Sequence, residues 1–173
     1  MRGTRYFLLL ACAAAAAFGK EPAAPMQLTS PDFHNGQRIP ARFTCDGQNT
    51  NPALRLSGAP PSARSLVLIV DDPDAPSGTF THWLLWNIDP GLKEIAGVPK
   101  GAIEGRNDFG NSGYGGPCPP SGVHRYLFKI YALDVILNLN AGAGRREVDA
   151  AIRGHITARG LLVGEYGRPE SAR

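Results

Sequence analysis

The sequence predicts one mainly β domain, with antiparallel β-sheets in a sandwich-like arrangement and a peripheral helix in the C-terminal half. The 173 residues include 21 glycines and 15 prolines, a content typical of a turn-rich β chain. Short apolar runs rich in β-branched and aromatic residues alternate with turn signals, as they do in strands of a β-sheet protein. One stretch alone has the spacing of an amphipathic helix.

The composition limits the class of function. Charged residues make up 19% of the chain and hydrophobic residues 43%, so it is neither a disordered tail nor a membrane bundle. The net charge is only +3, and the arginines form no dense run, so no nucleic-acid partner is indicated. A Walker-type phosphate loop is absent, and no motif implies a cofactor. The length suits a single domain, which we place at residues 26–173.

Residues 1–25 differ in composition and read as a signal peptide followed by a linker. Arg2 and Arg5 precede an apolar run over residues 6–18, which is too short to span a bilayer but typical of a signal-peptide core. We therefore expect export to the periplasm or beyond the cell. A lipobox-like sequence ending at Cys12 leaves an alternative open, in which lipidated Cys12 anchors the protein to a membrane.

Export would leave Cys45 and Cys118 in the mature chain. Two cysteines in an oxidising compartment often pair, but both of these lie in loops. The sequence does not place them within bonding distance, so it leaves a Cys45–Cys118 disulfide open.

The first part of the predicted domain contains short strands. We expect them over residues 26–29, 39–43 and 54–56. An Asn-Gly turn at 35–36 separates the first two, and the polar run 45–52 reads as a loop because it has no apolar period.

Two longer strands follow. Residues 65–71 form a continuous apolar run rich in β-branched side chains, as expected of a central strand. Residues 80–88 form the next strand. By the period of two, its even positions share an apolar face that only His82 interrupts.

The C-terminal half begins with a long loop. Residues 91–122 are rich in glycine, and a loop of this length in a compact domain is usually functional. A strand is expected over 124–133, and helical spacing predicts a helix over 146–158. Gly160 stands where a C-terminal helix cap belongs, and residues 161–166 read as the last strand.

Four polar side chains stand at strand ends and are expected to converge. Asp72 ends one strand, His82 lies on the next, and His124 and Tyr126 project from one face of a third. Two imidazoles, a phenol and a carboxylate that orients an imidazole suit a phosphate or another oxyanion. If the imidazoles donate as cations, anion binding should weaken as the pH rises through their pKa values.

Other interpretations of these residues remain open. Asp72 could cap a turn, and His82 and Tyr126 could be ordinary core residues whose polar atoms are satisfied. The aspartate with two histidines could hold a metal, although the local spacing of known metal motifs is missing. Ser121 with His124 could serve a hydrolase, although no Gly-x-Ser-x-Gly elbow is present.

Longer motifs around these residues resemble a known family. Residues 72–76 (Asp-Pro-Asp-Ala-Pro), the His-Trp pair at 82–83 and residues 115–126 are similar to the two signature regions of the phosphatidylethanolamine-binding protein family. This family includes Raf kinase inhibitor protein. The Gly-Pro-Cys-Pro-Pro form within 115–126 resembles the bacterial branch, and the resemblance extends over residues 26–168.

The resemblance implies a β fold with one peripheral helix and a small pocket for phosphate-like anions. It implies a protein that binds a phosphate, phospholipid head group or carboxylate, not an enzyme, with an inhibitory or regulatory role. The alternative is an inhibitor of a protease or other enzyme that acts through its surface loops. Cys118 replaces a rim proline of the animal proteins, so their kinase-contact surface is not carried over. The ligand-binding residues that the resemblance implies are Asp72, Pro76, His82, Gly116, Pro117, His124 and Tyr126.

Overall fold

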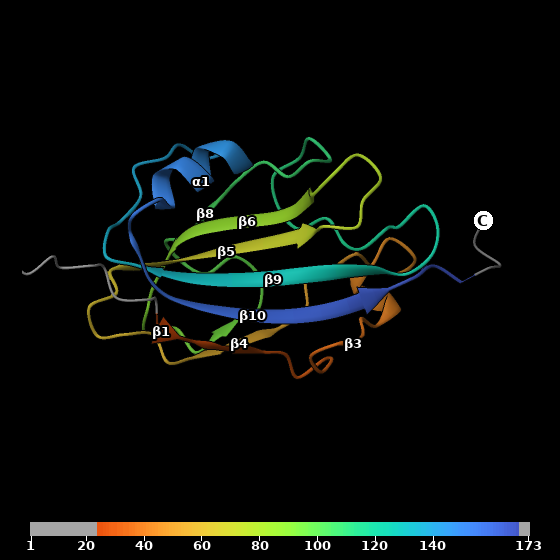
Figure 1. The fold of residues 1–173 in the computed structure, drawn as a ribbon, viewed down its shortest axis with the longest axis horizontal. Coiled ribbons are helices and arrows are strands. Elements are labelled where there is room, and N and C mark those ends of the chain that lie inside the picture. Colours follow the sequence, from red (N-terminus) through yellow and green to blue (C-terminus); the bar gives the residue numbers. More distant parts are fainter. Residues whose placement is uncertain (1–23, 170–173) are drawn as a thin grey trace, which may run out of the picture.

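The computed structural model describes residues 24–169, whose strands form two sheets packed face to face (Figure 1). The larger sheet has the order β1 (Ala24–Pro25), β10 (Ile156–Tyr166), β9 (His124–Leu133), β5 (Ser65–Asp72), β6 (Phe80–Ile88) and β8 (Ile103–Glu104), and β3 (Gln37–Arg38) also pairs with β10. The smaller sheet has the order β2 (Gln27–Thr29), β4 (Leu54–Ser57) and β7 (Glu94–Ile95). The described helical segments are α1 (Arg145–Ile152) and the 3-10 turn η1 (Ala41–Phe43).

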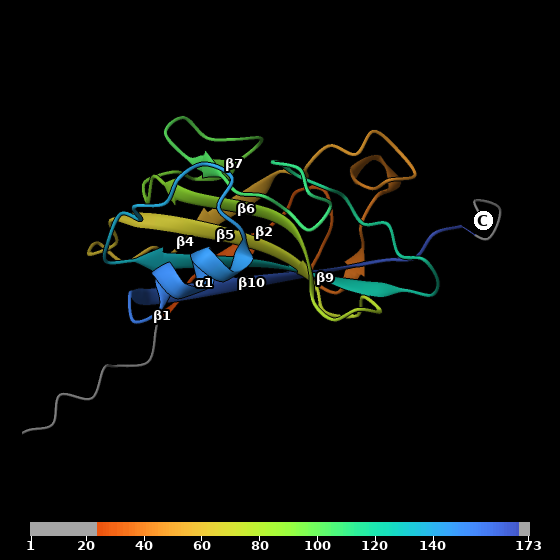
Figure 2. The ribbon, with the colours of Figure 1, turned by 90° about the horizontal axis from the view of Figure 1, so that it is seen from above.

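The larger sheet has an apolar layer on each face, and all eight residues of β5 are buried. Leu66, Leu68 and Val70 face the smaller sheet in the main core. Val67 and Ile69 point the other way, into a second cluster that α1 covers. The smaller sheet and α1 therefore lie on opposite sides of the larger sheet (Figure 2). The predicted mainly β, sandwich-like fold with one helix in the C-terminal half is confirmed.

A β-bulge in β6 changes which way His82 points. Val70 pairs with Trp83, but the next residue, Asp71, pairs with Thr81, so His82 is the extra residue in β6. A bulge of this kind locally breaks the strict alternation of side chains between the two faces. Strict alternation with Leu84 and Trp86 would place the His82 side chain on the α1 side of the sheet. Because of the bulge, it lies instead beside Tyr126.

A second irregularity lies at Asn87, which has a positive φ of 57°. Leu84 and Trp86 pack on the α1 side, whereas Ile88 belongs to the core between the sheets. The prediction that the even positions of this strand share one face is therefore wrong. Two inserted residues shift the register against β5, and each shift exchanges the two faces.

Two other boundaries differ from those predicted. Residues 39–43 do not form a strand, because they tighten into η1, in which the Phe43 N–H donates to the Pro40 carbonyl at 3.0 Å. Proline has no N–H for a sheet ladder, which favours a turn here. The helix ends at Ile152 instead of residue 158, since Gly154 has a φ of 82° and β10 follows.

Gly160 lies inside β10 and is not a helix cap. A Cβ on this residue would lie 2.7 Å from the Met26 carbonyl oxygen, so glycine allows the N-terminal segment to approach β10 closely. Residues 91–122 are largely a loop, as predicted, but they also contain β7 and β8.

The N-terminal segment covers the outer edge of β10. β1 pairs in parallel with β10 through Ala24 and Pro25, so the last residues of the predicted linker belong to the sheet. Further along, β3 also pairs in parallel with β10. The predicted signal-peptide core at 6–18 and Cys12 lie outside the described residues. No helix among residues 24–169 is long and apolar enough to cross a membrane.

Candidate ligand-binding site

The antiparallel pairing brings three polar strand ends to one place. β5 ends at Asp72, while its two neighbours, β6 and β9, begin at this same edge of the sheet. A pocket of about 260 Å³ opens there. Its lining consists of Asp72, Ala75, Pro76, Ser77, Phe80, His82, Phe109, Cys118, Pro119, Pro120, His124 and Tyr126.

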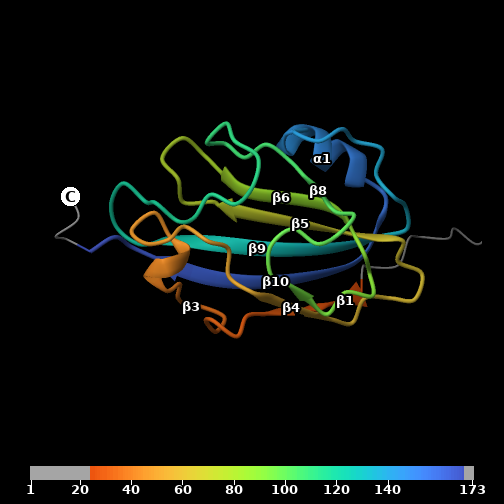
Figure 3. The ribbon, with the colours of Figure 1, turned by 180° about the vertical axis from the view of Figure 1, so that it is seen from behind.

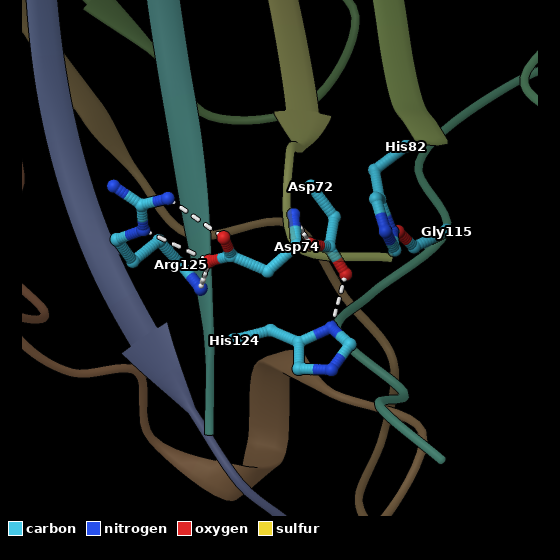
Figure 4. A network of polar contacts seen from close by, with 6 residues as sticks. All are labelled: Asp72, Asp74, His82, Gly115, His124 and Arg125. Atoms are coloured by element: carbon cyan, nitrogen blue, oxygen red, sulfur yellow. Dashed lines mark hydrogen bonds and ion pairs between the residues drawn. The ribbon is translucent and has the colours of Figure 1, made fainter. Parts of the chain in front are cut away.

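The carboxylate of Asp72 is buried and both of its oxygens are engaged. Oδ1 accepts the Asp74 backbone N–H at 2.8 Å, and Oδ2 lies 2.7 Å from Nδ1 of His124 (Figure 4). The carboxylate therefore keeps a proton on Nδ1 of His124 and fixes the orientation of its ring. The remaining nitrogen, Nε2, accepts a hydrogen bond when the imidazole is neutral and donates one when it is protonated.

His82 is held as a neutral imidazole. Its Nδ1 lies 2.6 Å from the Gly115 carbonyl oxygen, so this nitrogen carries a proton and donates. Burial lowers the pKa of His82, and that effect outweighs the Gly115 hydrogen bond and nearby carboxylates, which raise it. Phe80, Phe109 and Tyr126 surround the ring at centroid distances of 5.1, 5.4 and 5.2 Å. Near neutral pH, Nε2 of His82 is therefore an acceptor and not the cationic donor that the sequence suggested.

Tyr126 supplies a donor without a protein partner. The residue is fully buried, and its hydroxyl makes no hydrogen bond of good geometry with residues 24–169. Burial raises the pKa of Tyr126, and the nearby charge of Asp72 raises it further. The phenol therefore stays protonated at any physiological pH and can donate to a ligand.

An ion pair ties the loop after β5 to the start of β9. Asp74 accepts three hydrogen bonds from Arg125, at 3.0 Å from its backbone N–H and at 2.9 and 2.6 Å from its guanidinium group. These hydrogen bonds hold the pKa of Asp74 well below its usual range. Since Asp74 also donates to Asp72, the pair keeps the carboxylate beside His124 (Figure 4).

A disulfide between Cys45 and Cys118 supports the opposite wall, with the two Cα atoms 5.4 Å apart. The Cys45 N–H also donates to the Pro117 carbonyl at 3.1 Å. The segment with η1 and the loop before β9 thus lie together at the pocket end of the sheet (Figure 3).

Gly116 and Pro117 hold this wall but do not line the pocket. The Gly116 N–H donates to Oδ1 of Asn49 at 2.7 Å, and a Cβ on Gly116 would collide with the Phe43 carbonyl. These two residues, which the resemblance implies as ligand-binding, therefore lie behind the lining of the pocket. The close backbone approach accounts for the glycine in structural terms.

Comparison with known proteins identifies the family. A family model described as phosphatidylethanolamine-binding protein matches residues 29–167. The chain belongs to the phosphatidylethanolamine-binding protein family. The resemblance noted in the sequence is thereby confirmed, and the bacterial branch that it indicated includes archaeal proteins as well.

Members of the family from distant organisms share much of the sequence. A UPF0098 protein of Pyrococcus horikoshii is 52% identical over 146 residues, covering 79% of this chain and 74% of that protein. The crystal structure of a phosphatidylethanolamine-binding protein homologue from Chlamydia trachomatis is 40% identical, has a TM-score of 0.80, and the match covers 85% of this chain and all of that one. Escherichia coli YbcL, described as a member of the mammalian family, is 32% identical with a TM-score of 0.79, covering 84% of this chain and all of YbcL.

The structure brings together most of the residues that the family motifs indicate. Ser121 is exposed, does not line the pocket, and makes no hydrogen bond with His124. Among residues 24–169, no three or more histidine, cysteine, aspartate or glutamate side chains are grouped to hold a metal ion. The predicted ligand-binding residues found in one pocket are Asp72, Pro76, His82, His124 and Tyr126.

Sequence reasoning missed the aromatic wall and the ion pair. Phe80 lies on the strand of His82, but the bulge breaks the alternation from which the side of its ring would be inferred. Phe109 lies in the long loop and carries no periodic signal. The partner of Arg125 was hidden because Asp74 is 51 residues away in the chain.

Proposed function

We propose that this member of the phosphatidylethanolamine-binding protein family is an exported binding protein whose pocket holds a phosphate, phospholipid head group or carboxylate. The observation that carries the proposal is the buried Tyr126 hydroxyl, which has no partner among the described residues although it belongs to a pocket. A buried donor without a partner costs stability, and a ligand oxygen would satisfy it.

The other polar groups indicate which form of the anion binds. Near neutral pH, Asp72 and Nε2 of His82 are both acceptors, so a fully ionised phosphate would meet two acceptors. A phosphate that keeps one proton donates to an acceptor while it accepts from the Tyr126 hydroxyl. Phosphate monoesters lose their second proton at about pH 6. We therefore expect binding to favour the singly ionised ester.

The remaining walls suit an organic substituent on that anion. Pro76, Phe80 and Phe109 give the pocket an apolar side next to its polar end. Pockets that combine a few convergent polar groups with apolar walls are typical of small-molecule sites. A phosphorylated head group fits this division better than a bare inorganic ion.

Two features support export. The composition of residues 1–25 is that of a signal peptide, and a Cys45–Cys118 bond is characteristic of oxidising compartments. A binding role without catalysis is in keeping with the position of Ser121 outside the pocket. Inhibition of a partner enzyme stays a prediction from the family resemblance.

Calorimetric titration with inorganic phosphate and phosphorylethanolamine tests the pocket. His82→Ala removes an acceptor from the pocket wall and should weaken binding of both ligands about tenfold or more. His155→Ala is the matched control, because that imidazole is half exposed and pairs with Asp134 at 2.8 Å, away from the pocket. Equal affinities in the wild type and His82→Ala would rule out this pocket as the binding site.

The same titrations at pH 5.5 and pH 8 test the protonation state. Phosphorylethanolamine should bind more weakly at the higher pH, because the ester has then lost the proton that it donates to an acceptor of the pocket. An affinity that does not change with pH would contradict binding of a protonated anion.

A further inference from the structure

A second cavity of about 240 Å³ adjoins the pocket. Phe109 and Cys118 line both cavities, so these two side chains form the ridge between them. The Phe109 ring rests on the backbone of Gly115, where a Cβ would come within 2.5 Å of two ring carbons. Glycine at this position therefore lets one edge of the ring approach the backbone closely, and the ring lines both cavities. The further lining of the second cavity comes from Cys45, Asn49, Asn107, Asn111, Ser112, Tyr114 and Gly116.

The two cavities differ in charge. The first contains the ionisable groups Asp72, His82, His124 and Tyr126. In the second, cysteines apart, Tyr114 is the one titratable residue, and its hydroxyl donates to the Phe43 carbonyl at 2.9 Å. Burial raises the pKa of Tyr114, so it stays neutral. The second cavity therefore offers hydrogen bonds but no charge.

Several of its polar groups have no partner within residues 24–169. Asn107 is not among them, since its amide donates to Gly113 at 2.9 Å and accepts from the Asn111 backbone at 3.2 Å. These bonds shape the loop and leave the Asn111 side-chain amide and the Ser112 hydroxyl unbonded at the cavity. Asn49 uses its Oδ1 for Gly116, while its Nδ2 makes no hydrogen bond.

We propose that the second cavity is a subsite for an uncharged, hydroxyl-bearing group attached to the anion, so that the complete ligand is a phosphate ester of a polyol. The inference rests on the proposed function, because the first cavity must hold the phosphate. Free amide and hydroxyl groups pair with hydroxyl groups of a ligand, and a neutral cavity selects against a second charge. The ester linkage passes over the ridge of Phe109 and Cys118.

Three ligands compared by calorimetry at one pH test the subsite. Inorganic phosphate reports on the first cavity alone. Ethyl phosphate adds carbon without hydroxyl groups, and glycerol 3-phosphate adds hydroxyl groups. We expect glycerol 3-phosphate to bind the wild type about five- to tenfold more tightly than ethyl phosphate, as one or two net hydrogen bonds would produce.

A double variant, Asn111→Ala with Ser112→Ala, should abolish that preference and leave the phosphate affinity unchanged. Both residues are exposed and lie outside the first cavity, so the variant should fold. Asn140→Ala removes an exposed amide from another loop and should keep the preference. A ratio near one in the wild type, or an undiminished ratio in the double variant, would overturn the subsite.

These outcomes are distinct from failure of the first pocket. If inorganic phosphate does not bind, or binds His82→Ala equally well, the proposed function fails. If phosphate binds as expected but the hydroxyl groups add nothing, the subsite alone fails. If the hydroxyl groups do add affinity, two monoesters, glycerol 3-phosphate and glucose 1-phosphate, separate the sources of the ligand, since preference for the first indicates a lipid-derived head group and preference for the second a soluble sugar phosphate. Either preference supports the subsite.

Discussion

At the scale of single residues, two buried polar side-chain atoms lack a partner in residues 24–169, Nε1 of Trp86 in the core and the Tyr126 hydroxyl, and of these only the Tyr126 hydroxyl belongs to the pocket. The buried Tyr126 hydroxyl has no partner in residues 24–169, whereas the Tyr166 hydroxyl donates to Oδ2 of Asp46 at 2.8 Å. Both tyrosine side chains are buried, but only the hydroxyl of Tyr166 makes a hydrogen bond of good geometry with the described residues. We therefore expect the Tyr126 hydroxyl to contribute to ligand binding and the Tyr166 hydroxyl to contribute to the stability of the fold.

Tyr126→Phe should weaken phosphate binding without lowering the free energy of unfolding. The removed hydroxyl makes no hydrogen bond of good geometry with the described residues, although it interacts with the nearby Asp72, so its loss should change the free energy of unfolding little. Tyr166→Phe should instead lower the free energy of unfolding by about 1 kcal/mol and leave phosphate affinity unchanged. Urea unfolding and calorimetry on both variants provide the check. Marked destabilisation by Tyr126→Phe would mean that the hydroxyl has a structural role.

His82 should make the folded protein sensitive to acid. In the unfolded chain its imidazole takes up a proton near pH 6.5, whereas burial lowers the pKa of the folded His82. Below about pH 6.5 the unfolded state therefore binds more protons, and stability falls with falling pH by at most about 1.4 kcal/mol per unit. His82→Gln should flatten this dependence between pH 8 and pH 5, and the exposed His34→Gln should not. Identical pH profiles for the wild type and His82→Gln would contradict the buried neutral imidazole.

The sequence identified the polar residues of the site but not their chemical state. Asp72, His82, His124 and Tyr126 stand at strand ends, and antiparallel pairing brings those ends together. His82 is neutral because it is buried, and the place of its proton on Nδ1 depends on the Gly115 carbonyl 33 residues away. No local pattern encodes that burial or that contact, so the sequence did not indicate that His82 is a neutral acceptor.

At the scale of elements, the longer strands were predictable and the departures from regularity were not. The runs at 65–72, 80–88 and 124–133 are apolar enough to define strands with nearly correct bounds. The bulge at His82 depends on pairing between two strands, so the sequence of one strand does not reveal it. The end of α1 was obscured because the apolar residues that begin β10 continue the helical spacing.

A buried charge attaches α1 to the sheet. Asp71 is fully buried, and its carboxylate lies 2.7 Å from Nζ of Lys129 and 2.5 Å from Nη1 of Arg145. Arg145 belongs to α1, where it also pairs with the half-exposed Asp149 at 2.9 Å. The same guanidinium thus has one buried and one exposed acidic partner.

Removing these two partners should have unequal effects. Asp71→Ala leaves two cations without their buried partner and should lower the free energy of unfolding by on the order of 3 kcal/mol. Asp149→Ala removes an exposed pair within the helix and should cost less than about 1 kcal/mol. Urea unfolding of the two variants measures the difference. Similar losses in both would mean that Asp71 does not anchor the helix.

At the scale of the whole molecule, the Cys45–Cys118 bond joins segments 73 residues apart. The sequence left this pairing open because the distance between two loops depends on the complete fold. Exchanging both cysteines for serine should lower the free energy of unfolding by about 3 to 4 kcal/mol, mainly through the greater freedom of the unfolded chain. Denaturant unfolding of the oxidised wild type and the double variant tests this expectation.

The same variant should keep most of its phosphate affinity. The wall beside Cys118 retains the hydrogen bonds of Gly116 to Asn49 and of Tyr114 to Phe43. We therefore expect less than a tenfold loss of binding at 25 °C. Complete loss of binding in a variant that still folds would show that the disulfide, and not these hydrogen bonds, shapes the pocket.

The N-terminal cover of β10 has a consequence for how partners can be recognised. Many peptide-binding domains capture an extended segment as an additional strand on an open sheet edge. Here β1 and β3 already occupy the edge of β10, and the other edge of the larger sheet is the two-residue strand β8. Within residues 24–169, the larger sheet therefore offers little open backbone for a foreign strand. A protein partner that docks against the larger sheet would therefore be recognised through loops and side chains and not by strand addition.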